Sequence, residues 1–157
     1  YSIADNDFPI GEYQSTELLL DYRHLTVRTR KMIAIAKIRA TILENVRNWF
    51  VDNDWIEVNV PTLVKSAVEG GSTLFPVKYF REEAYLSQSA QLYLEALIFS
   101  IGPVWTMGPS FRGEKSRTLR HLAEYFHLEA EAPWISLNDL FLIQEKLLVN
   151  LIGHVTK

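Results

Sequence analysis

Cysteine is missing from this 157-residue sequence, and so is any long apolar run. Without cysteine the chain forms no disulfide and offers no thiolate for catalysis, which is typical of a reducing compartment. No apolar run approaches the roughly 18 residues that span a bilayer, and no signal-peptide pattern opens the chain. We therefore expect a cytoplasmic protein without a membrane partner.

The sequence also lacks a strong charge of either sign. Its 16 basic and 19 acidic residues leave a formal net charge of −3. Proteins that bind nucleic acid mainly through charge are usually strongly basic, so this balance argues against that class, although a local basic patch is enough to contact phosphates. Hydrophobic residues make up 48% and charged residues 22%, as in a globular protein, and the length fits one domain or a large piece of one.

Several common catalytic signatures are absent as well. The sequence has neither the glycine-rich dinucleotide fingerprint nor the P-loop lysine motif, and no serine lies in a nucleophile elbow. Its four histidines form no i, i+4 pair and have no cysteine beside them, so no zinc site is predicted. Any nucleotide chemistry must then use arginine side chains and the surface of a sheet.

Two long segments carry apolar residues at helical spacing, and a shorter one lies between them. The first covers about residues 30–52, and the second begins after Ser136, where Asp139 completes the pattern of a helix start. Ser89 is placed to cap the short helix over 90–99. The long helices carry the stripes Ile35, Ile38, Ile42, Val46 and Trp49, and Leu137, Leu140, Phe141, Gln144, Leu147, Leu148 and Leu151.

Short strand-like segments are interspersed with these helices. Residues 55–60 alternate large apolar and polar side chains up to Pro61, and further strands are predicted over 75–80, 84–87, 104–107 and 111–112, with a charged hairpin loop over 113–120. Helices and strands do not alternate regularly, so we expect an α+β fold with an antiparallel sheet flanked by helices. The nearby aromatics Trp49, Phe50 and Trp55 are expected to be core or interface residues.

Residues 124–131 form the most informative strand. A period of two places Phe126, Leu128 and Ala130 on one face, and Tyr125, His127, Glu129 and Glu131 on the other. The polar face has two interpretations: the solvated side of an antiparallel sheet, or the floor of a polar pocket. This strand alone favours the solvated side.

Residues 111–125 contain four cationic side chains and a histidine between two predicted strands. A hairpin that presents arginines can bind phosphate through two hydrogen bonds from one guanidinium. The alternative is an ordinary charged turn in solvent.

Four ordered segments make the sequence similar to a known enzyme family. Residues 111–125 resemble motif 2 of the class II aminoacyl-tRNA synthetases that serve aspartate, asparagine and lysine. Residues 55–63 resemble motif 1, which forms the dimer interface of that family, and residues 69–75 and 88–93 resemble two further signatures. The motif 2 elements are Phe111-Arg112, Glu114, Arg120-His121-Leu122 and Glu124-Tyr125. The chain is thus expected to be the N-terminal part of a class II catalytic domain.

The resemblance implies a role for each matching residue of motif 2. Arg112 matches the catalytic arginine that bridges the α-phosphate of ATP and the carboxylate of the amino acid. A planar guanidinium held in place suits the transition state, because it can stabilise the negative charge that develops on the phosphate. Glu114 matches a contact to the adenine amino group, and Tyr125 stands where the family stacks an aromatic ring on adenine. The other expected ATP contacts are Arg120, His121 and Leu122. Lys115 and Arg117 are candidates for touching tRNA.

The amino-acid pocket is implied by residues outside that hairpin. Glu69 matches a mobile-loop residue near the substrate amino group, and Glu129 matches a carboxylate that helps to hold the ammonium. Gln88, Gln91 and Leu94 complete the expected pocket. Aspartyl enzymes carry a lysine at the position of Leu94, which pairs with the side-chain carboxylate of the substrate. A neutral leucine cannot compensate the charge of that buried carboxylate. The sequence therefore favours asparagine and is most like archaeal-type asparaginyl enzymes.

The resemblance implies a homodimer that uses ATP, asparagine and tRNA(Asn), with contacts between subunits through 31–61. The family's motif 3, its anticodon-binding barrel and its Mg²⁺ ligands are not found in the sequence. Because the chain begins at Tyr1 and stops at Lys157 after a helical segment, we expect a fragment whose Mg²⁺ ligands lie beyond it, and no metal site within it. The alternatives are an aspartate-activating relative (an aspartyl-tRNA synthetase or an ammonia-dependent asparagine synthetase) and a non-catalytic dimerising paralogue.

Overall fold

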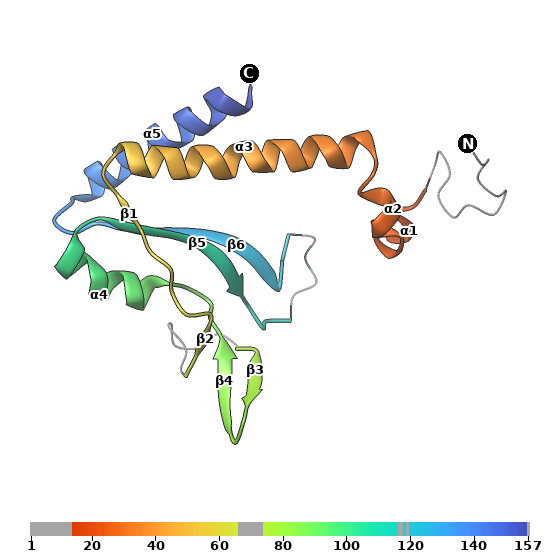
Figure 1. The fold of residues 1–157 in the computed structure, drawn as a ribbon, viewed down its shortest axis with the longest axis horizontal. Coiled ribbons are helices and arrows are strands. Elements are labelled where there is room, and N and C mark those ends of the chain that lie inside the picture. The colour runs from red at the N-terminus through yellow and green to blue at the C-terminus, as the bar shows by residue number, and fades with distance from the viewer. Residues whose placement is uncertain (1–13, 66–73, 116–117, 119, 157) are drawn as a thin grey trace. The chain divides into compact units, whose positions relative to one another are not determined.

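A computed structural model describes residues 14–65, 74–115, 118 and 120–156 (Figure 1). The chain divides into two compact units, one comprising residues 1–46 and 148–157 and the other residues 47–147. No helix among the described residues is long and apolar enough to cross a membrane.

The first unit is helical throughout its described part. It contains α1 (Thr16–Asp21), α2 (Arg23–Thr26), the first turns of α3 (Arg30–Asp52) and the end of α5 (Leu137–Val155). The bounds of α3 confirm the helix predicted over residues 30–52. Several members of its predicted stripe are partly exposed, namely Ile35, Ile38 and Ile42.

The second unit contains two three-stranded sheets. In the first, β5 (Val104–Phe111) pairs in parallel with β1 (Ile56–Glu57) and antiparallel with β6 (Glu124–Glu131). In the second, β4 (Glu82–Leu86) lies between β2 (Leu63–Val64) and β3 (Pro76–Tyr79), and both pairings are antiparallel. The α+β class is confirmed, with one short parallel pair added to the antiparallel sheet.

Two predicted strands differ in length from those observed. The strand expected over 55–60 is only two residues long, because its pairing with β5 covers just Ile56 and Glu57. The segments expected at 104–107 and 111–112 are one strand, which runs through Gly108 and Pro109. β5 pairs with β1 only as far as Trp105. On that side, Pro109 therefore has no neighbour among the described strands, and such an edge position tolerates a residue without a backbone N–H.

Different helices cover the two faces of the β5–β6 sheet. On one face the ring of Phe50, from the end of α3, stacks on Trp105 with centroids 4.6 Å apart and an interplanar angle of 9°. Both side chains are almost fully buried, which confirms the predicted core role of Phe50. On the other face, Leu94 of α4 (Gln91–Ile101) packs with Ala90 and with Val104, the neighbour of Trp105 on β5.

One predicted helix start is as expected, and the other differs by one residue. At α5 the Ser136 hydroxyl and backbone N–H donate to Asp139 Oδ2 over 2.6 and 2.8 Å, and these bonds lower the pKa of Asp139. This confirms the predicted start of the helix. At α4 the cap position is Ala90, and Ser89 just before it accepts the Gln91 N–H at 3.1 Å.

Candidate functional site

The β5–β6 hairpin carries a row of polar side chains on the face that α4 covers. Its register pairs Ser110 with Tyr125, Gly108 with His127 and Thr106 with Glu129. Directly paired residues of an antiparallel sheet point to the same side, so the alternate residues Val104, Thr106, Gly108 and Ser110 are the neighbours of the predicted polar face. Tyr125, His127 and Glu129 are half-buried, whereas Phe126 on the opposite face is 55% exposed. The polar face is therefore covered by protein, as in the pocket interpretation.

The row runs from a cation to a carboxylate. The guanidinium carbon of Arg112 lies 5.7 Å from the centre of the Tyr125 ring. The Tyr125 and His127 rings are 5.4 Å apart, and His127 Nδ1 lies 3.3 Å from Glu129 Oε1. Arg112 is exposed at the end of the strand, and its backbone N–H donates to the Ala123 carbonyl over 2.9 Å. One surface thus presents positive charge at one end and negative charge at the other.

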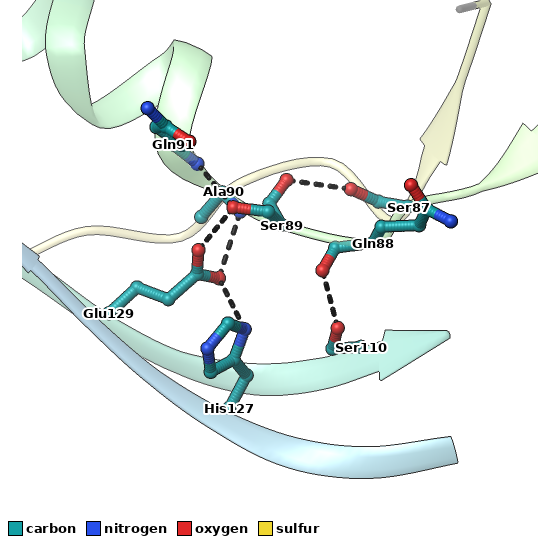
Figure 2. A network of polar contacts seen from close by, with 8 residues as sticks. All are labelled: Ser87, Gln88, Ser89, Ala90, Gln91, Ser110, His127 and Glu129. Carbon is teal, nitrogen blue, oxygen red and sulfur yellow. Dashed lines mark hydrogen bonds and ion pairs between the residues drawn. The ribbon is translucent and has the colours of Figure 1, made fainter. Parts of the chain in front are cut away.

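Glu129 is held where α4 begins (Figure 2). Its carboxylate accepts a hydrogen bond from the Ser89 hydroxyl and another, of 2.9 Å, from the Ala90 N–H. The first turn of a helix favours negative charge, because its N–H groups are unsatisfied and the helix dipole points its positive end there. The start of α4 therefore holds the Glu129 side chain in place through these two hydrogen bonds.

The segment 87–89 is fixed to the neighbouring strand by its own backbone. The Ser110 hydroxyl donates to the Gln88 carbonyl over 2.5 Å, and the Phe111 N–H donates to the Ser87 carbonyl over 3.0 Å. The Ser87 hydroxyl donates to the Ser89 carbonyl over 2.9 Å. Ser87 and Ser110 are both buried, so these bonds are shielded from water and hold Ser89 against the sheet.

A cavity of about 220 Å³ opens between these elements. Its floor comes from β5 and from Glu129, and its walls come from residues 59–62 and from Ser87, Ser89 and Ala90. A Cβ added to Gly108 would meet no atom within 4 Å, so the floor is open at that point. A small polar molecule placed there would meet hydroxyl groups, backbone atoms and one carboxylate.

A second cavity, of about 390 Å³, lies on the other side of Glu129. Gln91 and Glu131 line it together with apolar residues of α5, and Gln91 Nε2 donates to Glu95 Oε1 over 2.8 Å. Burial raises the pKa of Glu131, and the carboxylates of Glu95 and Glu129 raise it further. Glu129 thus lines both cavities, the smaller one with hydroxyl groups and backbone atoms and the larger one with mainly apolar side chains.

The structure brings only some of the predicted pocket residues to the first cavity. Glu129 lines it, whereas Gln91 lines the second cavity and turns to Glu95. Gln88 is buried, with 7% of its surface exposed. Leu94 is 0% exposed and belongs to the apolar cluster between α4 and β5. Its place in the amino-acid pocket stays a prediction, and in the structure its side chain packs against Ala90 and Val104.

The expected ATP and tRNA contacts lie along the connection between β5 and β6. Glu114, Lys115, Arg120 and Leu122 are exposed there. His121 is half-buried, and its Nε2 is buried without a hydrogen-bond partner among the described residues. Two further predictions, Glu69 and Arg117, lie outside the described residues. In the described part of the chain, no group of three or more His, Asp and Glu residues is arranged to hold a metal ion.

Sequence reasoning missed part of the cavity wall. The sequence predicts Ser89 as a helix cap within the signature 88–93, Thr106 as part of a strand and residues 59–62 as part of the motif 1 segment, but none of them as a pocket residue. The alternation of β5 could have placed Thr106 and Ser110 on the polar face, since both lie an even number of residues from Arg112. No local signal could have paired Ser89 with Glu129, which lies 40 residues away in sequence.

A family model described as tRNA synthetases class II (D, K and N) matches residues 15–157. The chain belongs to this family. The asparagine–tRNA ligase of Pyrococcus horikoshii is 55% identical over 147 residues, which cover 92% of this chain and 34% of the relative. The cytoplasmic asparagine–tRNA ligase of Saccharomyces cerevisiae is 47% identical over 146 residues, covering 93% of this chain and 26% of the relative.

Solved structures of the family have the same fold. The Pyrococcus horikoshii asparaginyl-tRNA synthetase complexed with asparaginyl-adenylate gives a TM-score of 0.90 at 52% identity, covering 97% of this chain and 36% of that one. An aspartyl-tRNA synthetase from Entamoeba histolytica gives a TM-score of 0.73 at 27% identity, covering 92% of this chain and 26% of that one. The family fold is thereby confirmed. The chain spans about a third of the length of the curated relatives it matches.

Proposed function

We propose that the whole protein activates asparagine with ATP and transfers the asparaginyl group to the 3′ end of tRNA(Asn). The observation that carries this proposal is the polar row, in which the Arg112 guanidinium lies over Tyr125 at one end and Glu129 is held at the other. The match to a relative complexed with asparaginyl-adenylate supports it, as does the higher identity to asparaginyl than to aspartyl relatives.

The charges of the row fit the first step of that reaction. Adenylate formation brings the amino-acid carboxylate to the α-phosphate, and negative charge builds up on the phosphate oxygens. A guanidinium that is already in place stabilises this charge with little reorganisation. Glu129, at the other end, suits the ammonium group of the same substrate. A molecule bound along the row would meet a partner of opposite charge at each end.

Other residues of the hairpin extend the proposed ATP site. Tyr125 offers the face of an aromatic ring for adenine, and Glu114 an acceptor for its amino group. Arg120, His121 and Leu122 follow on the same connection and are proposed to lie near the terminal phosphates. Mg²⁺ is proposed to accompany ATP as in class II synthetases generally, without a ligand assigned among the described residues.

The tRNA and a second subunit are the proposed macromolecular partners. Lys115 is an exposed cation beside the row, and Lys115 and Arg117 are proposed to touch the acceptor end of tRNA. A homodimer through residues 31–61 is proposed because α3 exposes Ile35 and Ile38 and is followed directly by the motif 1 strand. We place this protein in the cytoplasm, like its yeast relative.

Amino-acid-dependent exchange of pyrophosphate into ATP tests the proposal in the whole protein. We expect exchange with asparagine and little with aspartate or lysine, followed by transfer to tRNA and not to ammonia. Preferred exchange with aspartate would identify an aspartate-activating relative. The absence of exchange with any of the three would indicate a non-catalytic paralogue.

Arg112→Ala tests the residue on which the site depends. Losing one preorganised charge contact at the phosphate is expected to lower kcat/KM for exchange by about 10²- to 10³-fold. Arg81→Ala, which removes an exposed arginine between β3 and β4, serves as the matched control and should leave the rate unchanged. Full activity of the Arg112→Ala variant would show that the row is not the reaction site.

A further inference from the structure

The first unit carries a concentration of positive charge that the functional site does not use. Residues 22–43, which we call the basic segment, contain six of the 16 basic residues of the chain and none of its 19 acidic ones. All six cations are exposed, and they lie on α2, on the turn after it and on α3 (Figure 1): Arg23, Arg28, Arg30, Lys31, Lys37 and Arg39. In a chain with a formal net charge of −3, so uneven a distribution indicates an anionic partner.

The stability of the fold does not account for these charges. Arg28, Arg30 and Lys37 form no ion pair within the part of the chain that the structure describes. Arg30 and Lys31 lie in the first turn of α3, which holds no acidic residue. The positive end of the helix dipole lies at that turn, so cations there are unfavourable. An anion bound beside them would offset both the repulsion between the cations and this cost.

Two of the cations share one side of α3. Arg30 and Lys37 are seven residues apart, and two helical turns bring them to the same side, about 10 Å apart along the axis. Ile35 and Ile38 of the proposed dimer surface lie on a different side, because each is roughly 100° or more around the axis from Lys37. A second subunit on that stripe would therefore leave Arg30 and Lys37 accessible.

The composition of the basic segment fits the phosphates of a nucleic-acid helix. Tyr22 is its one Phe, Tyr or Trp residue and is half-buried, so the segment offers little for an unpaired base to stack on. Helices that lie in a membrane surface combine cations with Trp or Phe, and neither residue occurs here. We propose that the basic segment binds the phosphate backbone of a double-stranded stem of tRNA.

This contact differs from the one proposed for the acceptor end of tRNA. Lys115 and Arg117 lie between β5 and β6 of the second unit, whereas the basic segment belongs to the first. Phosphate contacts carry no sequence information, so the basic segment adds affinity for tRNA in general and leaves the choice of tRNA(Asn) to other contacts. The inference rests on the proposed function, which supplies tRNA as the partner.

The double variant Arg28→Gln/Arg30→Gln of the whole protein tests this surface. Each lost phosphate contact is expected to make the dependence of log K on log salt shallower by about 0.9. We expect tRNA(Asn) to bind about tenfold or more weakly at about 0.1 M salt, with a salt slope shallower by about two. Pyrophosphate exchange with asparagine needs no tRNA and should stay within about twofold of wild type, which also shows that the variant is folded.

Two further variants separate the charge from the shape of these side chains. Arg28→Lys/Arg30→Lys keeps both charges and should bind tRNA within about threefold of wild type, since lysine also pairs with phosphate. Lys78→Gln/Arg81→Gln removes two exposed cations of the β3–β4 hairpin and changes the net charge equally. This matched control should keep the affinity and the salt slope of the wild type.

Filter binding with tRNA(Asn) and with a blunt RNA duplex, and co-sedimentation with phosphatidylglycerol vesicles, distinguish the partners. Weaker binding of both RNAs by the Arg28→Gln/Arg30→Gln variant supports a stem contact. An unchanged salt slope, equal losses in both glutamine variants, or a loss of vesicle binding with duplex binding intact would overturn the inference. A wild type that binds tRNA through the basic segment but exchanges no asparagine would contradict the proposed function instead.

Discussion

Single residues of the polar row differ in how far the sequence could place them. Tyr125, His127 and Glu129 were assigned to one face because a strand alternates with a period of two, and that prediction is confirmed. The burial of this face was not predictable, because it depends on α4 and on the segment before it. For Leu94 a motif match gave the neighbours in sequence, whereas its full burial depends on how α4 packs on the sheet, which no local pattern specifies.

Glu131→Gln is expected to stabilise the protein at neutral pH. Burial raises the pKa of Glu131 above its unfolded value, so the folded state binds more protons and stability falls as pH rises through that interval. A neutral glutamine removes both the cost of burying the charge and the repulsion from Glu95 and Glu129, and the gain in stability is expected to be about 1 kcal/mol or less because the site is partly exposed to water.

Thermal unfolding of both proteins between pH 3 and pH 8 checks this sign. At pH values above the raised pKa of Glu131, the variant should have a higher melting temperature than the wild type. At acidic pH the two melting temperatures should be the same. Glu145→Gln, at an exposed site on α5, should change the melting temperature little at any pH. A variant that is less stable than wild type at neutral pH would show that the Glu131 charge is compensated.

At the scale of elements, the three longer helices were easier to predict than the strands, whereas the short helices α1 and α2 were not predicted. The long apolar stripe fixed both ends of α3, and the Ser136–Asp139 pair marked the start of α5. The strands differed because their limits depend on partners: β1 is cut short by its pairing with β5, and β5 continues past Pro109 along an edge. Such pairings join residues distant in sequence, so no local pattern specifies them.

Leu94→Lys tests how α4 packs on the sheet. Leu94 is fully buried beside Ala90 and Val104, so a lysine there would place an ammonium in an apolar cluster and is expected to cost about 3 kcal/mol or more. Leu92→Lys, on the exposed side of the same helix, should cost no more than about 0.5 kcal/mol. Urea unfolding measures both. A stable Leu94→Lys variant that gains aspartate-dependent exchange would instead support the substrate-facing position predicted from the sequence.

At the scale of the whole molecule, the proposed dimer concerns apolar side chains that α3 leaves exposed. In the first unit α3 presents Ile33, Ile35 and Ile38 to solvent, each 45–46% exposed. Apolar residues at helical spacing that remain accessible are typical of a surface that another chain covers. The dimer interface itself stays a prediction, which rests on the resemblance of residues 55–63 to motif 1.

Light scattering of the whole protein at micromolar concentration checks the predicted dimer. We expect a mass of two chains, and a shift toward one chain for Ile38→Glu, because a charge would be buried in the interface. Leu148→Glu, at an exposed apolar site outside residues 31–61, is the matched control and should remain a dimer. A wild-type mass of one chain would rule out the interface at that concentration.

The most direct measurement is a crystal structure of the whole protein with a non-hydrolysable analogue of asparaginyl-adenylate. We expect the group that replaces the phosphate to lie within hydrogen-bond distance of the Arg112 guanidinium, with the ammonium near Glu129 and the adenine against Tyr125. An analogue bound elsewhere, or an Arg112 side chain directed away from the β5–β6 face, would contradict it.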